Sequence, residues 1–158
     1  MENQASFHIR GLDPDLFSNL HALSDSELAA RSVVRMRVSE KPAAPCRITL
    51  DDAEIGESVL LLSYDHQPAD TPYRQQGPIF VREGGARFDA KNLVPLALQR
   101  RMLSLRGFDA AHLMVEADVI DGAEAAQVIA RLFTNSEVAY IHAHYAKRGC
   151  FAARIDRA

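Results

Sequence analysis

The last part of the chain, residues 138–156, constrains the fold more than any other segment. It holds two runs of alternating side chains, separated by Lys147, Arg148 and Gly149. A three-residue loop with Gly149 in the left-handed conformation is typical of a bulged β-hairpin. A shift of one residue would move every side chain to the opposite face, so the register can be tested by pairing. The sequence therefore predicts a C-terminal β-hairpin over 138–156.

The three-residue loop divides the predicted hairpin into an apolar face and a polar face. The apolar face pairs Tyr145 with Phe151, Ala143 with Ala153 and Ile141 with Ile155. The polar face pairs His144 with Ala152, His142 with Arg154 and Tyr140 with Asp156. A four-residue loop would place His144 opposite Phe151 and mix the two faces, so we favour the three-residue loop.

The remaining pattern predicts an α+β fold with about four helices beside a mainly antiparallel, or mixed, β-sheet. A chain of 158 residues is one domain of ordinary size, and we expect a single domain over 1–158. Expected helices follow caps at Asp13, Ser24 and Asp121, and a further helix covers 95–101. Expected strands cover 6–10, 32–38, 46–50, 57–65, 79–83, 103–108 and 111–120. Within them, Val59–Leu62 is apolar on both faces, as in a central strand covered on both sides.

Charge and hydropathy exclude several classes of protein. The formal net charge is -3, whereas nucleic-acid binding requires a basic face, so we expect no nucleic-acid partner. The longest apolar run, Val59–Leu62, is far shorter than the roughly 20 residues that span a bilayer, so we expect no membrane partner. No signal peptide is visible after Met1. The expected location is the cytoplasm, with Cys46 and Cys150 as reduced thiols.

The polar face of the predicted hairpin is the main candidate site. If strands 103–108 and 111–120 share its sheet, one face packs on the helices. The other face then collects the charged and titratable side chains of Arg106, Glu116, Asp118, His142, His144 and Arg154. This face is either solvated or a polar cleft. In the second case the long 66–78 loop covers it, and His66, Tyr73 and Arg74 are lid residues.

Three chemistries are compatible with these residues. His142 and His144, on one strand face, can chelate a divalent metal ion if His66, Cys150, Glu116 or Asp118 supplies a third ligand, although we do not favour a metal. Without a metal, the histidines can act as acid–base groups, and Arg154 beside His142 favours its neutral form. Cys46, followed by Arg47, and Cys150, near Arg148, are candidate nucleophiles because a nearby cation favours the thiolate.

Several segments taken together resemble a known family over nearly the whole chain. They are Cys46–Leu50, Tyr64–Gln67, Pro72–Arg74, Gly77–Arg82, Leu103–Arg106, Tyr140–His144 and Gly149–Arg154. The chain resembles an uncharacterised bacterial family, domain of unknown function 1203. The resemblance implies a bacterial, stand-alone domain and assigns neither an activity nor catalytic residues.

We therefore expect a protein that binds, and in the enzyme case transforms, a small anionic metabolite on the polar sheet face. His142 and His144 are the expected acid–base or ligand groups, and Cys46 and Cys150 are candidate nucleophiles. The expected ligand-binding residues are Arg154, Arg106, His66, Tyr73 and Arg74. The alternative is a non-enzymatic interaction domain that forms a homodimer through the sheet or its edge. The sequence leaves the cofactor, and the choice between enzyme and binding protein, open.

Overall fold

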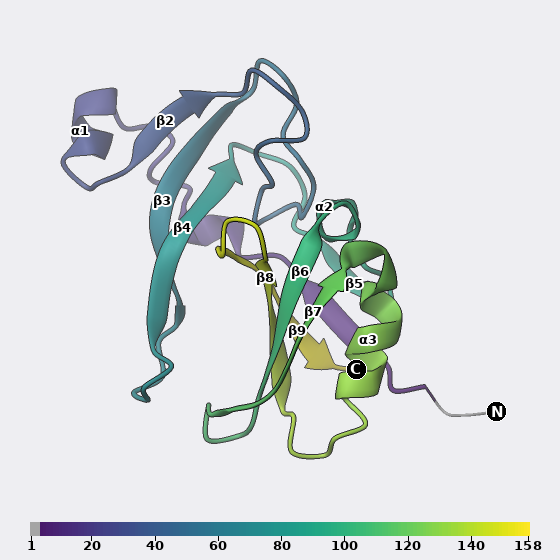
Figure 1. Ribbon diagram of the computed structural model, residues 1–158. Coiled ribbons are helices and arrows are strands. Elements are labelled where there is room, and N and C mark those ends of the chain that lie inside the picture. Colours follow the sequence, from purple (N-terminus) through teal and green to yellow (C-terminus); the bar gives the residue numbers. More distant parts are fainter. Residues whose placement is uncertain (1–3) are drawn as a thin grey trace.

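The computed structural model describes residues 4–158, which form two antiparallel sheets (Figure 1). The six-stranded sheet has the order β5-β1-β9-β8-β6-β7, and the three-stranded sheet has the order β2-β3-β4. The strands of the larger sheet are β1 (Phe7–Arg10), β5 (Asp89–Lys91), β6 (Met102–Phe108), β7 (Met114–Asp121), β8 (Tyr140–Tyr145) and β9 (Phe151–Arg157). Those of the smaller sheet are β2 (Val34–Arg37), β3 (Ser58–Gln67) and β4 (Gln75–Arg82).

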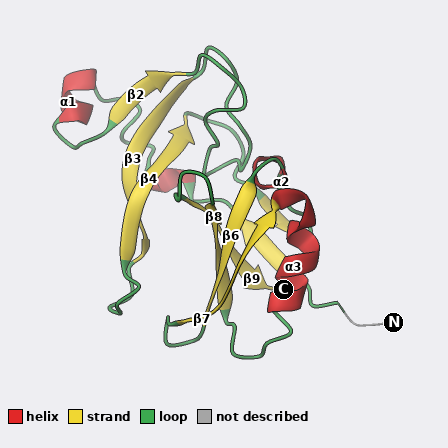
Figure 2. Cartoon of the chain, viewed as in Figure 1, coloured by secondary structure: helices red, strands yellow, loops and turns green. Residues whose placement is uncertain are grey.

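Three α-helices accompany the sheets in the described part of the chain (Figure 2). They are α1 (Asp25–Ala29), α2 (Leu96–Gln99) and α3 (Ala125–Leu132). The predicted α+β class is confirmed, but the count of about four helices is slightly too high. The segment after Asp13 forms only a short 3₁₀ turn, Pro14–Leu16, although Asp13 caps it as predicted. None of these helices is long and apolar enough to cross a membrane.

Helix α3 covers one face of the six-stranded sheet (Figure 1). Its apolar residues recur at helical spacing and form one stripe, as the sequence predicts. Ala125, Ile129, Leu132 and Phe133 are buried against the sheet, together with Leu103, Leu105, Ile141 and Ala143. This face of the sheet is the main apolar core.

The segment Val59–Leu62 lies in the central strand of the smaller sheet, and its coverage on both faces is confirmed. Val59 packs with Val38 on one side, whereas Leu60 and Leu62 belong to a separate cluster on the other. The neighbouring strand predicted over 46–50 is wrong. Residues 46–50 form a turn rather than a strand, because the Leu50 amide donates to the Cys46 carbonyl.

The expected long loop over 66–78 is much shorter in the structure. Strand β3 continues to Gln67 and β4 begins at Gln75, which leaves residues 68–74 as the connection. Pro78 lies within β4, opposite Ser63. An edge strand tolerates proline because the missing N–H can face away from the sheet, and β4 is an edge strand. His66 therefore belongs to a strand and not to a lid.

The C-terminal hairpin has the predicted register over most of its length. The pairs Tyr140–Asp156, Ile141–Ile155, His142–Arg154 and Ala143–Ala153 are confirmed. Near the turn a β-bulge intervenes, and His144 pairs with Phe151 instead of Ala152. Gly149 has the predicted left-handed conformation, with φ of 80°, but the Tyr145 amide donates to the Cys150 carbonyl around a four-residue loop. The bulge gives β9 one extra residue, which moves Phe151 to the histidine face.

The predicted faces of β7 are reversed. Asp118 pairs with Leu105 and Glu116 with Gly107, so both carboxylates lie on the α3 side of the sheet. There they contact α3 and the segment after it: Arg131 donates to Asp118 and Asn135 donates to Glu116. Because β7 is an edge strand, its inner face meets the polar margin of the helix. Glu116 and Asp118 are therefore not part of the histidine face.

Candidate metal centre

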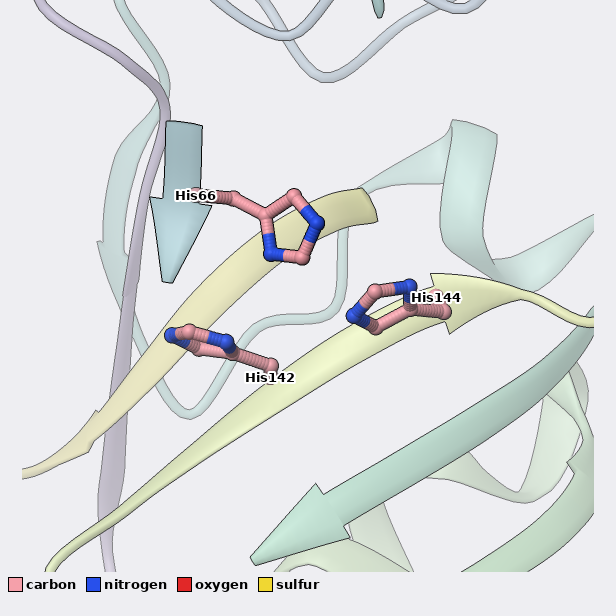
Figure 3. A group of neighbouring side chains, drawn as sticks. All are labelled: His66, His142 and His144. Carbon is pink, nitrogen blue, oxygen red and sulfur yellow. The ribbon is translucent and has the colours of Figure 1, made fainter. Parts of the chain in front are cut away.

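Three histidines from the two sheets meet at one point (Figure 3). His142 and His144 alternate on β8, so both side chains lie on the face opposite α3. His66, near the end of β3, reaches this face from the smaller sheet. One ring nitrogen from each histidine lies within 4.8 Å of the other two. The exposed fractions are 8% for His66, 3% for His142 and 1% for His144.

Aromatic rings enclose the histidine cluster, by which we mean His66, His142 and His144. The ring of Phe151 stacks on His66 with centroids 5.1 Å apart and an interplanar angle of 3°. It also meets the edges of the two other imidazoles. Tyr140 and Phe108 pack against His142. The bulge that brings Phe151 to this face thus shields the cluster from water.

Each imidazole of the cluster has at least one ring nitrogen without a hydrogen-bond partner in the protein. His144 Nδ1 lies 3.0 Å from the Gly149 carbonyl oxygen and donates its proton there, so its Nε2 carries the lone pair. The Nδ1 atoms of His66 and His142 are buried and have no hydrogen-bond partner. In Figure 3 these two Nδ1 atoms and the free nitrogen of His144 face the space between the rings. Buried polar atoms are rarely left without a partner, so a group that pairs with these nitrogens would be favourable here.

The surroundings keep all three imidazoles neutral. Burial, followed by the neighbouring histidines and Arg154, lowers the pKa of His142 to about 3. Burial is also the main cause that lowers the pKa of His144 to about 4, although the hydrogen bond to Gly149 opposes it. The pKa of His66 is lowered by burial and by Arg106. Neutral imidazole is the form that binds metal ions.

The two arginines expected to clamp an anion lie beside the cluster, on the strands that flank β8. Arg106 on β6 pairs with His142 and donates to the Ser104 hydroxyl. Arg154 on β9 lies over the Tyr140 ring at 4.1 Å and donates to Asp156. Half of the Arg154 side chain is exposed. Both cations are close enough to disfavour protonation of His142.

The expected lid residues are dispersed in the structure. Tyr73 and Arg74 lie on the exposed 68–74 connection. The Tyr73 ring meets the edge of Phe108, and Arg74 lies 4.0 Å from Asp65. Of the three, only His66 belongs to the cluster. Four residues are candidates for the third ligand: His66, Cys150, Glu116 and Asp118. Of these, the structure brings His66 to His142 and His144.

The two cysteines are free and lie in different environments. Cys46 is completely buried, and its sulfur accepts hydrogen bonds from the Ile48 and Arg82 amides. A buried thiol of this kind offers no access to a substrate. Cys150 is half-buried, and Arg47 Nη2 donates to its sulfur at 3.1 Å. Arg47, the cation that follows Cys46 in the sequence, is therefore hydrogen-bonded to Cys150 in the fold.

Sequence reasoning missed a hydrogen-bonded chain next to the cluster. Gln67 Nε2 donates to the Tyr140 hydroxyl at 2.9 Å, and His112 Nδ1 lies 2.7 Å from the same oxygen. This chain ties the end of β3 to β8, and it fixes the backbone beside His66. No pattern along the sequence links residues 67, 112 and 140, because they meet only through the packing of the two sheets.

Comparison with known families gives a match over residues 43–157, which include the whole histidine cluster. Comparisons with curated proteins and with solved structures find no match. The matching family model is described as Protein of unknown function (DUF1203), in agreement with the resemblance noted in the sequence. Because the model spans most of the chain, the protein belongs to the DUF1203 family.

Proposed function

We propose that this protein binds a divalent metal ion of the zinc type through His66, His142 and His144. The observation that carries the proposal is the set of three buried, neutral imidazoles that turn free nitrogens toward one space. A polar atom buried without a partner costs free energy, and a metal ion would satisfy both orphaned Nδ1 atoms at once. The hydrogen bond from His144 to Gly149 is the kind of contact that orients a metal-ligating imidazole.

The donor set favours zinc or a neighbouring transition metal over magnesium or calcium. The cluster offers imidazole nitrogen and no carboxylate, whereas magnesium and calcium prefer oxygen ligands. Ligands of a tetrahedral zinc ion lie roughly 3.3 Å apart, given zinc–nitrogen bonds of about 2.0–2.1 Å. The three ring nitrogens lie within 4.8 Å of one another, which is compatible with this spacing.

Three protein ligands leave one position of a tetrahedral ion for an external group. The histidines are neutral, so the ion's charge would not be cancelled by its ligands. Arg106 and Arg154 add positive charge at this place. An anionic group is thus the preferred fourth ligand, and we infer that the bound ion takes up a small anion. In the enzyme form of this proposal, the three histidines would hold the ion, which would supply Lewis-acid chemistry to that ligand.

Zinc titration of the purified protein against a chromophoric chelator tests this proposal. We expect one tightly bound zinc ion per chain. Single changes His66→Ala, His142→Ala and His144→Ala should each weaken zinc binding by at least about a hundredfold, because each removes a direct ligand. His21→Ala is the matched control, since His21 lies outside the cluster.

The proposal fails if the wild-type protein binds no zinc in competition with the chelator. It also fails if His142→Ala and His21→Ala bind zinc equally well. Circular dichroism of each variant would show that the alanine substitutions retain the fold. A loss of zinc binding with retained structure supports the three-histidine site.

A second candidate function is self-association through strand β7. This edge strand exposes an apolar row, in which Val115 is 37% and Val119 is 61% exposed, and Met102 on β6 continues it. Edge strands carry unpaired backbone groups that can pair with another chain. A homodimer would show the doubled mass in light scattering, and Val119→Asp should return it to a monomer. A monomeric wild-type protein at high concentration would argue against this candidate.

A further inference from the structure

A cavity with a volume of about 430 Å³ lies beside the turn between β8 and β9. Its walls come from the 40–45 loop, the end of α2 and the 145–150 turn, and Phe80 of β4 adds an apolar side. The histidine cluster does not line it. A volume of this size suits a small organic molecule rather than a single ion.

Arg47 lines this cavity and places a buried positive charge beside it. It is 1% exposed, and its guanidinium donates to the carbonyl oxygens of Pro45 and Phe151 and to the sulfur of Cys150. An arginine has five N–H donors, so two remain for a ligand. Among residues 4–158, no carboxylate forms an ion pair with Arg47. A buried charge without a counter-charge is unfavourable, and an anion in the cavity would supply one.

Tyr145 provides a second, independent indication of a ligand. Its side chain is 4% exposed and lines the cavity, and its hydroxyl is buried without a hydrogen-bond partner. The guanidinium groups of Arg47 and Arg101 lie 5.0 and 5.2 Å from the centre of its ring. The hydroxyl can therefore donate to an acceptor that the two cations also attract.

The remaining charges at the cavity favour an anion as well. Five basic residues and one acidic residue, Glu40, line it. Asp52 pairs with Arg100 and Arg101, which offsets those two cations. Lys147 and Arg148, at the rim, form no ion pair within the described chain. The balance at the cavity is thus positive around Arg47.

We propose that this cavity binds a small organic anion, a molecule with a phosphate or carboxylate group and an apolar part. Arg47 and the Tyr145 hydroxyl hold the anionic group, and Arg148 and Lys147 attract it from the rim. Phe80 and Met102 contact the apolar part. The site is distinct from the histidine cluster and does not depend on a bound metal.

Calorimetric titrations with phenyl phosphate, benzoate, inorganic phosphate and benzyl alcohol test the proposal. A chelator is present throughout, so that no metal in the histidine cluster contributes. We expect saturable binding of phenyl phosphate or benzoate, weaker binding of inorganic phosphate, and none of neutral benzyl alcohol. The tighter of the first two probes identifies the anionic group.

Tyr145→Phe is the most informative variant. Its melting temperature should be equal to or above that of the wild type, because the deleted hydroxyl is buried without a partner in the free protein. Its affinity for the anion should fall about tenfold, the effect of one hydrogen bond to a charged group. Arg148→Gln should weaken binding several-fold, whereas Arg31→Gln, a matched change at a residue that does not line the cavity, should not. Unchanged affinity in Tyr145→Phe, or no saturable binding by the wild type, overturns the proposal.

The rate of Cys150 alkylation tests whether the anion binds within the cavity. Cys150 lines the cavity, whereas Cys46 is fully buried, so iodoacetamide should modify one thiol selectively. Phenyl phosphate should slow this reaction in the wild type, as followed by mass spectrometry of the peptide that contains Cys150. At the same concentration it should protect Tyr145→Phe less. Binding without protection of Cys150 would mean that the anion binds elsewhere, against the proposal.

Discussion

The two faces of strand β8 are equally buried but chemically opposite. On one face, Ile141 and Ala143 pack among apolar side chains beneath α3. On the other, His142 and His144 meet His66, and two of these three rings have an orphaned nitrogen. The first face stabilises the fold by removing apolar surface from water. The second sacrifices some stability, since a polar atom without a partner is costly to bury.

This contrast indicates why the histidine face is of functional interest. Leucine or phenylalanine at the same positions would fill the space without leaving a hydrogen-bonding group unpaired. Three converging imidazoles are typical of a site that binds a ligand, such as a metal ion. Changes of pH and substitutions that act on one face alone separate the contributions of the apolar face and the histidine face.

Acid should destabilise the metal-free protein through the histidine face. The folded pKa values of His142 and His144, about 3 and about 4, lie below the ordinary value of 6.5. Below pH 6.5 the unfolded chain therefore binds protons that the folded chain does not. The free energy of unfolding consequently decreases as the pH is lowered. From pH 7 to pH 5 the free energy of unfolding should drop by about 4 kcal/mol for the two histidines together. The drop should level off below the folded pKa values.

Urea denaturation at a series of pH values, with a chelator present, measures this effect. The variant His142→Leu should lose about half of the pH dependence, which assigns that half to one residue. A wild-type protein equally stable at pH 7 and pH 5 would contradict the account of neutral, buried imidazoles.

On the apolar face, Leu105→Ala should lower the free energy of unfolding by about 3 kcal/mol. Leu105 is completely buried in the core beneath α3, and its truncation leaves a cavity. Urea denaturation at neutral pH checks the loss. Zinc affinity of the folded variant should stay near that of the wild type, because the histidines lie on the opposite face. A large loss of zinc affinity in the folded state would show that the two faces are not independent.

On the histidine face, His142→Leu should change stability at neutral pH by only about 1 kcal/mol, in either direction. The substitution removes an orphaned Nδ1 and keeps an apolar side chain of similar size. The same variant should lose the stabilisation that zinc gives the wild type, which is about 2.7 kcal/mol at a hundred times the dissociation constant. Melting curves with and without zinc measure both effects. Severe destabilisation without zinc would instead mark His142 as a structural residue.

The sequence predicts those parts of the fold that depend on local periodicity. The stripe of α3 and the hairpin pairs up to Ala143–Ala153 follow from spacing alone, and both are confirmed. The bulge near Phe151 could not be predicted, because it depends on what covers the face. Phe151 lies on the histidine face instead of the apolar core, because it stacks on His66, a residue distant in sequence.

The candidate site was predicted in part for the same reason. The shared face of His142 and His144 follows from alternation on one strand. The sequence favours His66 both as a third ligand and as a lid residue, and only the contact between the sheets places it in the cluster. The reversed faces of β7 arise from tertiary packing too, since Asp118 is held by Arg131 after a turn and a helix. The contact between Arg47 and Cys150 could not be predicted from the sequence, because the cysteine adjacent to Arg47 in the chain is Cys46.

X-ray absorption spectroscopy of the zinc-loaded protein tests the central claim most directly. The account predicts one zinc ion with three imidazole ligands at about 2.0–2.1 Å and one further light-atom ligand. Sulfur at about 2.3 Å would place the ion at a cysteine. Such a result, or a shell of oxygen atoms without imidazole, would contradict the assignment of His66, His142 and His144 as the metal site.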